Sequence, residues 1–401
     1  MDETRKERNK KEWHRLKIGL FCVVAVLLTA GVTAGIVIRM YGGSDNMAYV
    51  TKFAAVLNSI EEYYIGDADM ETATNAAYNA LVASATDRWS YYMNEEEYEA
   101  YLDYTENQYQ GIGITVQTDT EASYMLSVYS VEQDSPAALA GLEIGDVFHT
   151  VGGTDCAGMT VSALKEIIQK HVDQTLDITV ERNGETVDLT VTCTTIQTVP
   201  VRYELLDQKV GYIKIKNFES GCADAFIEAV DVLLEQGATG LVFDVRGNPG
   251  GQLSELLDML DYLLPEGEMF VSVDQSGEEE VYQSDDSCVE LPMSVLIDAD
   301  SYSAAEFFAA ALQEYGLATT VGEATTGKGR SQITLEYTDG TALHISSKRY
   351  LTPNRVDLSE QGGLTPDMAV ALTEDAEQLL RSDRLDYDVD PQLQAAVAAV
   401  Q

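Results

Sequence analysis

The sequence predicts a multidomain α+β protein that begins with one transmembrane helix. The chain has 401 residues, which is more than one ordinary domain needs. A stretch of 21 residues, 18–38, carries no charge. Beyond it, the spacing of apolar residues changes from helical to strand-rich, and then to an alternation of buried strands with helices. These three observations predict a membrane segment, a helical region, a β-rich domain and an α/β core.

The charge balance is strongly acidic. There are 25 Lys and Arg residues against 67 Asp and Glu residues, a net charge of −42. Such a chain repels a phosphate backbone, so we expect no nucleic-acid partner. The five cysteines form no C-x-x-C pair and have no histidine close in sequence, so we predict no metal site and leave any disulfide pairing open.

The N-terminal segment has the pattern of a membrane anchor. Residues 1–17 carry seven Lys or Arg against four acidic residues, and residues 18–38 are long enough to span a bilayer. The basic flank predicts a cytoplasmic tail at 1–17, with the rest of the chain outside the cytoplasm on a single-pass cell-membrane anchor. A cleaved signal peptide ending near Ala34 is the alternative. Because the apolar run continues to Ile38, we favour the uncleaved anchor.

Residues 39–107 are predicted to be helical. Phe53, Val56, Leu57 and Ile60 recur at helical spacing, and a second amphipathic stretch covers residues 70–83. We expect this region to lead from the membrane to the body of the protein. It is also our candidate for self-association into a homodimer.

Residues 108–197 read as a β-rich domain. Strands are expected at 112–117, 124–131 and 147–151, a helix at 160–170, and a hairpin around Asn183-Gly184. The loop Gly111-Ile112-Gly113-Ile114 and the string Asp134-Ser-Pro-Ala-Ala-Leu-Ala-Gly-Leu-Glu-Ile-Gly-Asp146 resemble bacterial PDZ domains.

The PDZ resemblance implies a peptide-binding site. Backbone N–H groups of the 111–114 loop would bind the C-terminal carboxylate of a protein tail, and the tail would add as a strand beside the helix. Leu164 and Ile168 would contact the last side chain of that tail. Taken alone, Gly111 and Gly113 would more simply mark a bend in a strand.

Residues 198–372 alternate between strands and helices. The loop 246–251, Arg-Gly-Asn-Pro-Gly-Gly, follows the buried strand 240–245, at the strand end where α/β folds place their sites. Its paired glycines allow a backbone N–H to approach a substrate closely. Residues 373–401 read as a peripheral C-terminal helical tail.

Ser303 lies where the apolar strand 292–298 leads into a helix. The free N–H groups of the first helical turn can stabilise an oxyanion beside the serine. The alternative is a capping box formed by Ser303 and Glu306. Lys328 lies between Gly327 and Gly329, with Gln332 four residues on, and by itself would be a solvated or phosphate-binding lysine.

The loop, the serine and the lysine, in this order after a PDZ-like domain, resemble the C-terminal processing peptidases, which are tail-specific serine proteases. The resemblance implies an α/β protease core of the ClpP/crotonase-like type and no cofactor. It implies that Ser303 is the nucleophile, Lys328 the general base and Gln332 the residue that orients the lysine. The oxyanion hole would use the N–H of Ala304 and that of Gly250 or Gly251, a choice that stays open.

Two positions depart from the family's pattern. Ser301-Tyr302 stands before the nucleophile, where the family usually has small residues, so Tyr302 is expected to reshape the site. Arg88 stands where proline is common, and we expect this change to affect the helical region and not catalysis.

A Ser–Lys pair requires a neutral lysine. The free pKa of lysine is about 10.4, so work at neutral pH needs it lowered by about 3 units, or roughly 4 kcal/mol. Burial can supply this, and no acidic residue lies between Ala324 and Ile333. A histidine-based triad is the alternative, but only His344 falls in the catalytic domain, and we interpret it as structural.

The sequence thus predicts a membrane-anchored endopeptidase that recognises protein C-termini, with tail binding able to assemble the site. The alternative is an inert, membrane-tethered PDZ scaffold, which Tyr302 alone supports. A serine hydrolase of another fold would need a G-x-S-x-G motif, and Ser303 is not in one.

Overall fold

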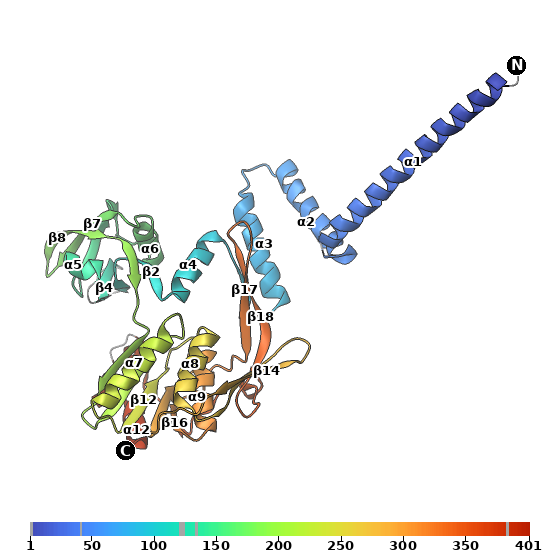
Figure 1. Cartoon of the computed structure of the whole chain (residues 1–401). Coiled ribbons are helices and arrows are strands. Elements are labelled where there is room, and N and C mark those ends of the chain that lie inside the picture. Colours follow the sequence, from blue (N-terminus) through green and yellow to red (C-terminus); the bar gives the residue numbers. More distant parts are fainter. Residues whose placement is uncertain (1–2, 41, 120–124, 133–134, 382–384) are drawn as a thin grey trace. The chain divides into compact units, whose positions relative to one another are not determined.

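The computed structural model describes residues 3–40, 42–119, 125–132, 135–381 and 385–401 (Figure 1). The chain divides into two compact units, one ending at Ala80 and one beginning at Leu81. Tyr124 at the start of a predicted strand, Asp134 at the start of the PDZ-like string, and residues 1 and 2 of the predicted basic tail lie outside the described residues.

The first unit is helical. It contains α1 (Glu3–Met40), α2 (Ser44–Tyr63) and the larger part of α3 (Met70–Ala85). Within α1, the stretch Trp13–Arg39 is long and apolar enough to cross a membrane, and none of its apolar window is buried. A signal sequence would pass the same test of length and composition, so the anchor stays a prediction.

The region 39–107 is not wholly helical. After α3 the chain forms a short strand, β1 (Tyr91–Met93), which pairs antiparallel with β18 (Ala342–Leu351). It then forms α4 (Glu95–Thr105), which begins with a capping box between Asn94 and Glu97. A three-residue strand is too short to show a period of two, which is why the sequence pattern missed β1.

The PDZ-like domain is an antiparallel sheet with two helices. The strands run in the order β3-β4-β5-β7-β8, with β6 paired to β5. Their bounds are β3 (Ile114–Asp119), β4 (Met125–Val131), β5 (Val147–Val151), β6 (Thr154–Asp155), β7 (Thr175–Arg182) and β8 (Glu185–Thr192). The helices are α5 (Pro136–Ala140) and α6 (Val161–Gln169). The predicted hairpin around Asn183-Gly184 is confirmed by β7 and β8.

A two-stranded ribbon joins the start and the end of this domain. It pairs β2 (Gln108–Gly111) antiparallel with β9 (Thr194–Gln197). Both chain connections to the rest of the second unit therefore leave the PDZ-like domain side by side.

The α/β core is built on a six-stranded sheet. Its strands, in order across the sheet, are β10 (Val201–Leu205), β11 (Val210–Ile215), β12 (Gly240–Asp244), β15 (Met293–Ile297), β16 (Ala318–Gly322) and β19 (Met368–Ala369). All neighbours are parallel except β10 and β11. The parallel strands bring the loops after β12 and β15 to the same edge of the sheet, as an active site in such a fold requires.

Helices cover both faces of this sheet. Figure 1 shows α7 (Cys222–Glu235), α8 (Leu253–Leu263) and α9 (Ala304–Glu314) gathered beside β12 and β16. These three helices bury one face, which includes Phe243 and Val295. Alternate residues such as Val242 and Leu296 point to the other face and pack against α12 (Pro391–Ala399).

The prediction of a peripheral tail is therefore wrong for α12. Leu393, Ala396 and Val397 are buried and form part of the second core. A parallel sheet is covered on both faces, and α7, α8 and α9 cover only one. The sequence pattern did not show that the other face was left for α12.

A second, antiparallel sheet completes the unit. It runs β1-β18-β13-β14, with β17 also paired to β18. The new members are β13 (Gly267–Val273), β14 (Glu279–Ser284) and β17 (Arg330–Glu336). The remaining short helices are α10 (Leu358–Gln361), α11 (Glu374–Arg381) and η1 (Tyr387–Val389). β17 and β18 form an antiparallel hairpin around Asp339-Gly340.

Candidate active site

Ser303 is the last residue before α9, in the turn that follows β15. Its φ of 60° is unusual for a residue with a side chain, and such conformations cost free energy unless the surroundings hold them. The Ser303 N–H donates to Glu306 Oε2 at 3.0 Å, which is the Glu306 half of a capping box. The residue is 7% exposed. The capping contact uses the N–H of Ser303, so it is compatible with a nucleophilic role for the Ser303 hydroxyl.

The chain brings the predicted catalytic and oxyanion residues to one cavity. Ser303, Lys328, Gln332, Gly250 and Gly251 all line a space of about 470 Å³. They come from the turn before α9, the segment between β16 and β17, β17 itself, and the loop after β12. Ala304 follows directly as the first residue of α9.

Glu306 joins the nucleophile turn to the lysine segment. Its carboxylate is fully buried. Besides the Ser303 N–H, it accepts the N–H groups of Gly327 at 2.6 Å and Lys328 at 2.8 Å, and the hydroxyl of Thr325. Hydrogen bonds to a carboxylate are stronger than neutral ones, and burial keeps water from competing for them. The four donors are therefore held firmly around Glu306. Glu306 thus fixes where the backbone of Lys328 lies relative to Ser303.

Burial lowers the pKa of Lys328 to about 8. The negative charges of Asp87, Glu306 and Glu219 act in the opposite direction and raise it. The absence of acids between Ala324 and Ile333 was therefore a poor guide, since all three carboxylates come from other segments. Desolvation of the ammonium outweighs their effect.

The glycine loop after β12 lies directly against Ser303. Gly250 has φ +87°, and a Cβ atom there would lie 2.7 Å from Ser303 Cβ and 2.8 Å from Ala304 N. Its own N–H donates to Asn248 Oδ1 at 2.8 Å. Within the described residues, the N–H groups of Gly251 and Ala304 donate to no protein acceptor. Gly251 is thus the better placed of the two glycines to serve as an oxyanion donor.

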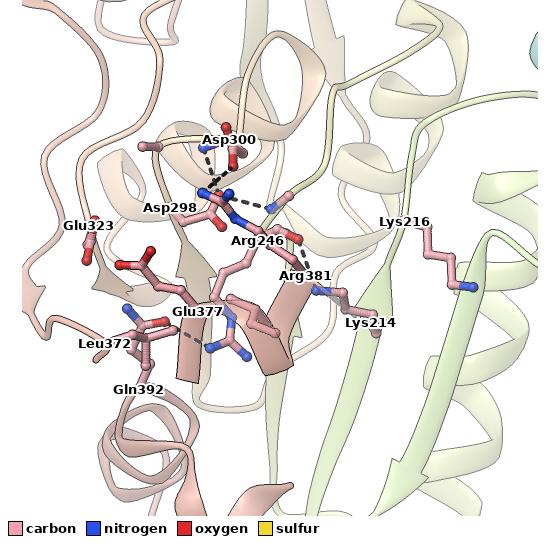
Figure 2. Close-up of a pocket in the computed structure, with 13 residues that line it drawn as sticks. Lys214, Lys216, Arg246, Asp298, Asp300, Glu323, Leu372, Glu377, Arg381 and Gln392 are labelled. Atoms are coloured by element: carbon pink, nitrogen blue, oxygen red, sulfur yellow. Dashed lines mark hydrogen bonds and ion pairs between the residues drawn. The ribbon is translucent and has the colours of Figure 1, made fainter. Parts of the chain in front are cut away.

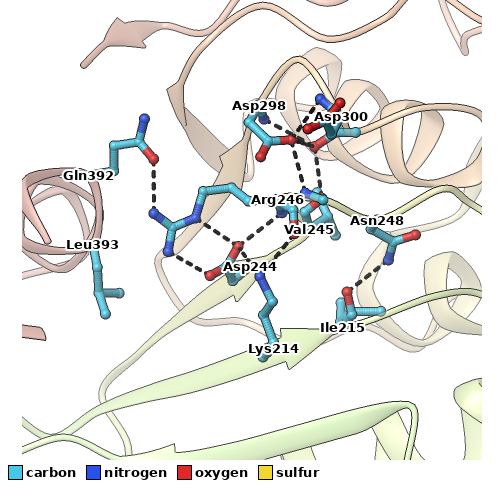
Figure 3. Close-up of polar contacts among 12 residues, drawn as sticks. Lys214, Ile215, Asp244, Val245, Arg246, Asn248, Asp298, Asp300, Gln392 and Leu393 are labelled. Atoms are coloured by element: carbon cyan, nitrogen blue, oxygen red, sulfur yellow. Dashed lines mark hydrogen bonds and ion pairs between the residues drawn. The ribbon is translucent and has the colours of Figure 1, made fainter. Parts of the chain in front are cut away.

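The same loop is fastened to the nucleophile turn at three points. Tyr302 N–H donates to the Asn248 carbonyl at 3.1 Å. The Ser301 hydroxyl donates to the Val245 carbonyl at 2.7 Å. Gly247 N–H donates to Asp298 Oδ1 at 2.9 Å. Figure 3 shows Asp298 beside the contacts around Arg246. These bonds hold the glycines and the serine in one geometry.

Gln332 lines the cavity, and its side-chain amide nitrogen is hydrogen-bonded to neighbouring residues. Its Nε2 donates to the Arg330 carbonyl and to Ser346 Oγ, both at 3.1 Å. Ser346 Oγ in turn donates to Asp87 Oδ1 at 3.1 Å. The described hydrogen bonds therefore connect Gln332 to the segment that follows α3.

The two departures from the family's pattern meet at the lysine. Lys328 Nζ lies 4.9 Å from the ring centre of Trp89 and 5.8 Å from that of Tyr302. The guanidinium of Arg88 lies 4.2 Å from the ring centre of Trp89, so Arg88 and Lys328 both lie against this ring. Arg88 thus lines the cavity as well as following the helical region, and its effect on catalysis stays a prediction. Arg88 and Trp89 line one side of the cavity, which the sequence did not indicate because they lie far along the chain from Ser303 and Lys328.

Several further cavity residues were missed by sequence reasoning. Burial raises the pKa of Glu219 to about 7, while burial and the charge of Lys328 lower the pKa of His344 to about 4. His344 bonds Thr334 Oγ1 at 2.9 Å and stacks on Tyr91. Three more aromatic residues complete the wall, namely Tyr101, Tyr104 and Tyr350. No local motif marks these residues, because they come from segments far apart in the chain: Tyr101 and Tyr104 lie in α4, and His344 and Tyr350 lie in β18.

In the PDZ-like domain, β3 is the edge strand of the sheet and lies beside α6. Gly113, just before β3, has φ +83°, and Ile112 is buried. Leu164 and Ile168 on α6 are also buried, in the core of the domain. The loop Gly111–Ile114 and the predicted side-chain contacts therefore lie at the β3 edge of the sheet, where a further strand can pair.

Comparisons with known proteins agree with this arrangement. The model of "Peptidase family S41" matches residues 209–370 and that of "PDZ domain" matches residues 110–193. The chain is 28% identical over 349 residues to "Carboxy-terminal processing protease CtpA" of Bacillus subtilis, covering 84% of this chain and 74% of that protein. It is 27% identical over 376 residues to "Probable CtpA-like serine protease" of Staphylococcus saprophyticus, covering 92% and 75%.

Among solved structures, a protein assigned to the S41 proteases from Bacteroides fragilis aligns with a TM-score of 0.58. The alignment covers 83% of this chain and 91% of that one at 18% identity, which supports the fold. The two family matches and the curated relatives show that the chain is a serine peptidase that carries a PDZ domain followed by a domain of peptidase family S41.

Proposed function

We propose that this protein is a membrane-anchored endopeptidase that binds protein C-termini through its PDZ domain and cleaves them with a Ser303–Lys328 pair. The observation that carries the proposal is the shared cavity. Ser303, Lys328 and the Gly250–Gly251 loop line it together, and burial lowers the pKa of Lys328 to about 8. A lysine that is partly neutral near physiological pH can act as a general base.

The reaction follows from these positions. Ser303 Oγ attacks the peptide carbonyl while Lys328 takes its proton. The N–H groups of Ala304 and Gly251 receive the oxyanion, and Lys328 then returns the proton to the leaving amine. A water molecule activated by Lys328 releases the acyl-enzyme. We assign to the Gln332 carbonyl oxygen the role of orienting the ammonium, since its amide nitrogen is already held by Arg330 and Ser346.

Substrate recognition is assigned to the free edge of β3. An extended tail would pair with this strand, and its carboxylate would bind at Gly111–Ile114, beside Leu164 and Ile168 of α6. Tail binding would act as a gate that assembles the Ser–Lys site. The α1 helix would hold the catalytic part outside the cytoplasm, and the α2–α3 region would be the place of any homodimer. We further assign the parallel core to the ClpP/crotonase-like type.

The test uses the full chain in detergent micelles, with and without Ser303→Ala. Each form is incubated with an unstructured protein that ends in a free apolar C-terminus, and with the same protein amidated at its C-terminus. We expect cleavage that vanishes in Ser303→Ala and weakens with the amide. Cleavage that survives Ser303→Ala would overturn the site. Binding that depends on the carboxylate, without cleavage in any form, would favour the scaffold.

A further inference from the structure

A buried ionic cluster connects the C-terminal helix to the glycine loop of the active site. Its centre is Arg246, whose side chain is 1% exposed. Arg246 Nε and Nη2 donate to Asp244, at 3.0 and 2.7 Å. Nη2 also lies 2.9 Å from Asp390 Oδ2, and Nη1 donates to Gln392 Oε1 at 2.9 Å. Figure 3 shows the guanidinium between Asp244 and Gln392.

The two C-terminal members have few alternatives. Asp390 and Gln392 are each 1% exposed. Asp390 uses its other oxygen, Oδ1, to cap α12, accepting the N–H groups of Gln392 and Leu393 at 3.0 Å. Gln392 uses Nε2 to donate to the Val370 carbonyl at 2.7 Å. Gln392 therefore joins its own segment to Arg246 through a hydrogen bond, and Asp390 joins its segment to Arg246 through an ion pair.

Arg246 opens the loop that ends at Gly250 and Gly251. Its N–H donates to Asp244 Oδ1 at 2.9 Å, and its carbonyl accepts Lys214 Nζ at 2.9 Å. Burial alone would raise the pKa of Asp244, but the charges of Arg246 and Lys214 hold it well below its usual range. The start of the loop is thus fixed through both the backbone and the side chain of Arg246.

A cavity next to the cluster offers the Arg246 side chain an alternative position. A cavity of about 450 Å³ is lined by Arg246, Gly247, Asp298 and Gln392, as Figure 2 shows. A buried guanidinium that loses an acceptor must find another or be solvated, because an unsatisfied charge in the interior is costly. Turning into this cavity would satisfy it. The turn would disturb the Gly247–Asp298 bond that fastens the loop to the nucleophile turn.

We infer that Asp390 and Gln392 are positioning residues of the peptidase reaction, which act by holding Arg246 and with it the loop 246–251. They touch no substrate. The inference rests on the proposed function for its catalytic consequence, but the effect on the loop does not. A small shift in the position of Gly251 would misplace an oxyanion donor, and misplacement by about 1 Å can cost about 100-fold in rate.

The variants separate the clamp from the fold. Asp390→Asn keeps an oxygen to cap α12, since Asn and Asp cap equally well, but removes the acceptor for Arg246. Gln392→Leu and Gln392→Glu both lose the amide donor to Val370, yet only the first loses the acceptor for Arg246. Leu393→Ala is the matched control, because it opens a cavity under α12 without touching the cluster.

The measurements use the full chain in detergent micelles. The first is amide hydrogen exchange of Gly247, Asn248 and Gly250, whose N–H groups are hydrogen-bonded, compared at equal fractions of folded protein. The second is kcat and KM on the tail substrate. We expect Asp390→Asn and Gln392→Leu to speed exchange in this loop about tenfold and lower kcat about tenfold or more, with KM little changed. Gln392→Glu should lose less than Gln392→Leu, and Leu393→Ala should leave exchange in the loop slow.

Two results would overturn the inference. One is exchange in the loop that is as slow in Asp390→Asn and Gln392→Leu as in Leu393→Ala. The other is equal losses of kcat in all three variants, in proportion to their losses of Tm. If the unaltered chain shows no Ser303-dependent cleavage, the proposed function fails, and the exchange data still decide on the clamp.

Discussion

Lys328 Nζ lies 4.9 Å from the centre of the Trp89 ring. The two residues stand far apart in sequence, yet Trp89 forms the wall that separates the lysine from solvent on one side, with Tyr302 on another. Trp89 is held by the same turn that binds Gln332 through Ser346, since its N–H donates to Asp87 Oδ1 at 3.0 Å. The segment that leaves the helical region therefore forms part of the cavity that holds Lys328.

Removing this wall should make the lysine more basic. Burial is the main cause that lowers the pKa of Lys328 to about 8, so Trp89→Ala, which admits water, should raise that pKa toward about 10.4. Because the general base must be neutral, the rise of kcat/KM with pH should move to higher pH by about 1 unit or more. Trp89→Phe is the control and should shift it less. An unchanged pH profile in Trp89→Ala would show that the ring does not desolvate the lysine.

Glu219 should act in the opposite direction. Its negative charge raises the pKa of Lys328, and its own pKa of about 7 means that it is mostly ionised at pH 8. Glu219→Gln should therefore move the rise of kcat/KM to lower pH, by less than about 1 unit, and increase activity at pH 7. The exposed Glu228 on α7 offers a control of equal charge. A shift in Glu228→Gln as large as in Glu219→Gln would contradict a local effect.

Lys328 should destabilise the fold at neutral pH. Its pKa falls from 10.5 to about 8 on folding, so the unfolded chain binds the proton more tightly. The cost is full below pH 8 and vanishes above 10.5, and at pH 7 it is at most about 3 kcal/mol. Lys328→Met should raise the free energy of unfolding at pH 7 but not at pH 10.5. Lys165→Met, on the exposed face of α6, should change neither value in a denaturant titration.

Glu306 should be needed for activity because it holds the backbone of Ser303 and Lys328 together. Glu306→Gln replaces an oxygen that accepts N–H or hydroxyl donors by an amide group that repels them. We expect kcat to fall about 100-fold, because the Lys328 segment loses its attachment to the nucleophile turn. Glu314 on the same helix accepts the Thr352 hydroxyl and the Asn354 N–H, so Glu314→Gln is a matched change away from the cavity. Equal losses of kcat in both variants would point to a general effect on α9.

Gly250 should tolerate no side chain. The Cβ of Gly250→Ala would press on Ser303 Cβ and Ala304 N, beside the proposed oxyanion hole. We expect a loss of about 100- to 1,000-fold in kcat, the size seen when an oxyanion donor is removed. Gly247→Ala meets a similar backbone strain, with φ +70°, but open space, and should lose far less. If both variants were equally impaired in a peptide-cleavage assay, strain and not contact would be the cause.

The sequence was informative where a short motif carries its own geometry. The strand before Ser303, the helix after it and the glycine loop after β12 all stand where the apolar pattern placed them. The pattern was silent where chemistry depends on distant segments. Trp89, Glu219 and His344 reach the cavity from three separate elements, and none lies in a local motif.

The C-terminal segment shows the same limit. Its helix was predicted, but its burial depends on an uncovered face of the sheet, which only the full topology shows. Arg246 could likewise be placed in a loop, whereas its partners Asp390 and Gln392 could not be guessed across more than a hundred residues. Local propensity fixes elements, and long-range packing fixes sites.

The place of Asp390 in the chain also bears on how the protein is made. A ribosome adds residues from the N-terminus onward, so Ser303, Lys328 and the glycine loop are synthesised before Asp390 and Gln392. Until α12 follows and docks, the buried guanidinium of Arg246 lacks two of its acceptors. The peptidase core is thus synthesised before the residues that fix its glycine loop. The site is completed only after α12 has been made and has docked, when little of the chain remains unfolded.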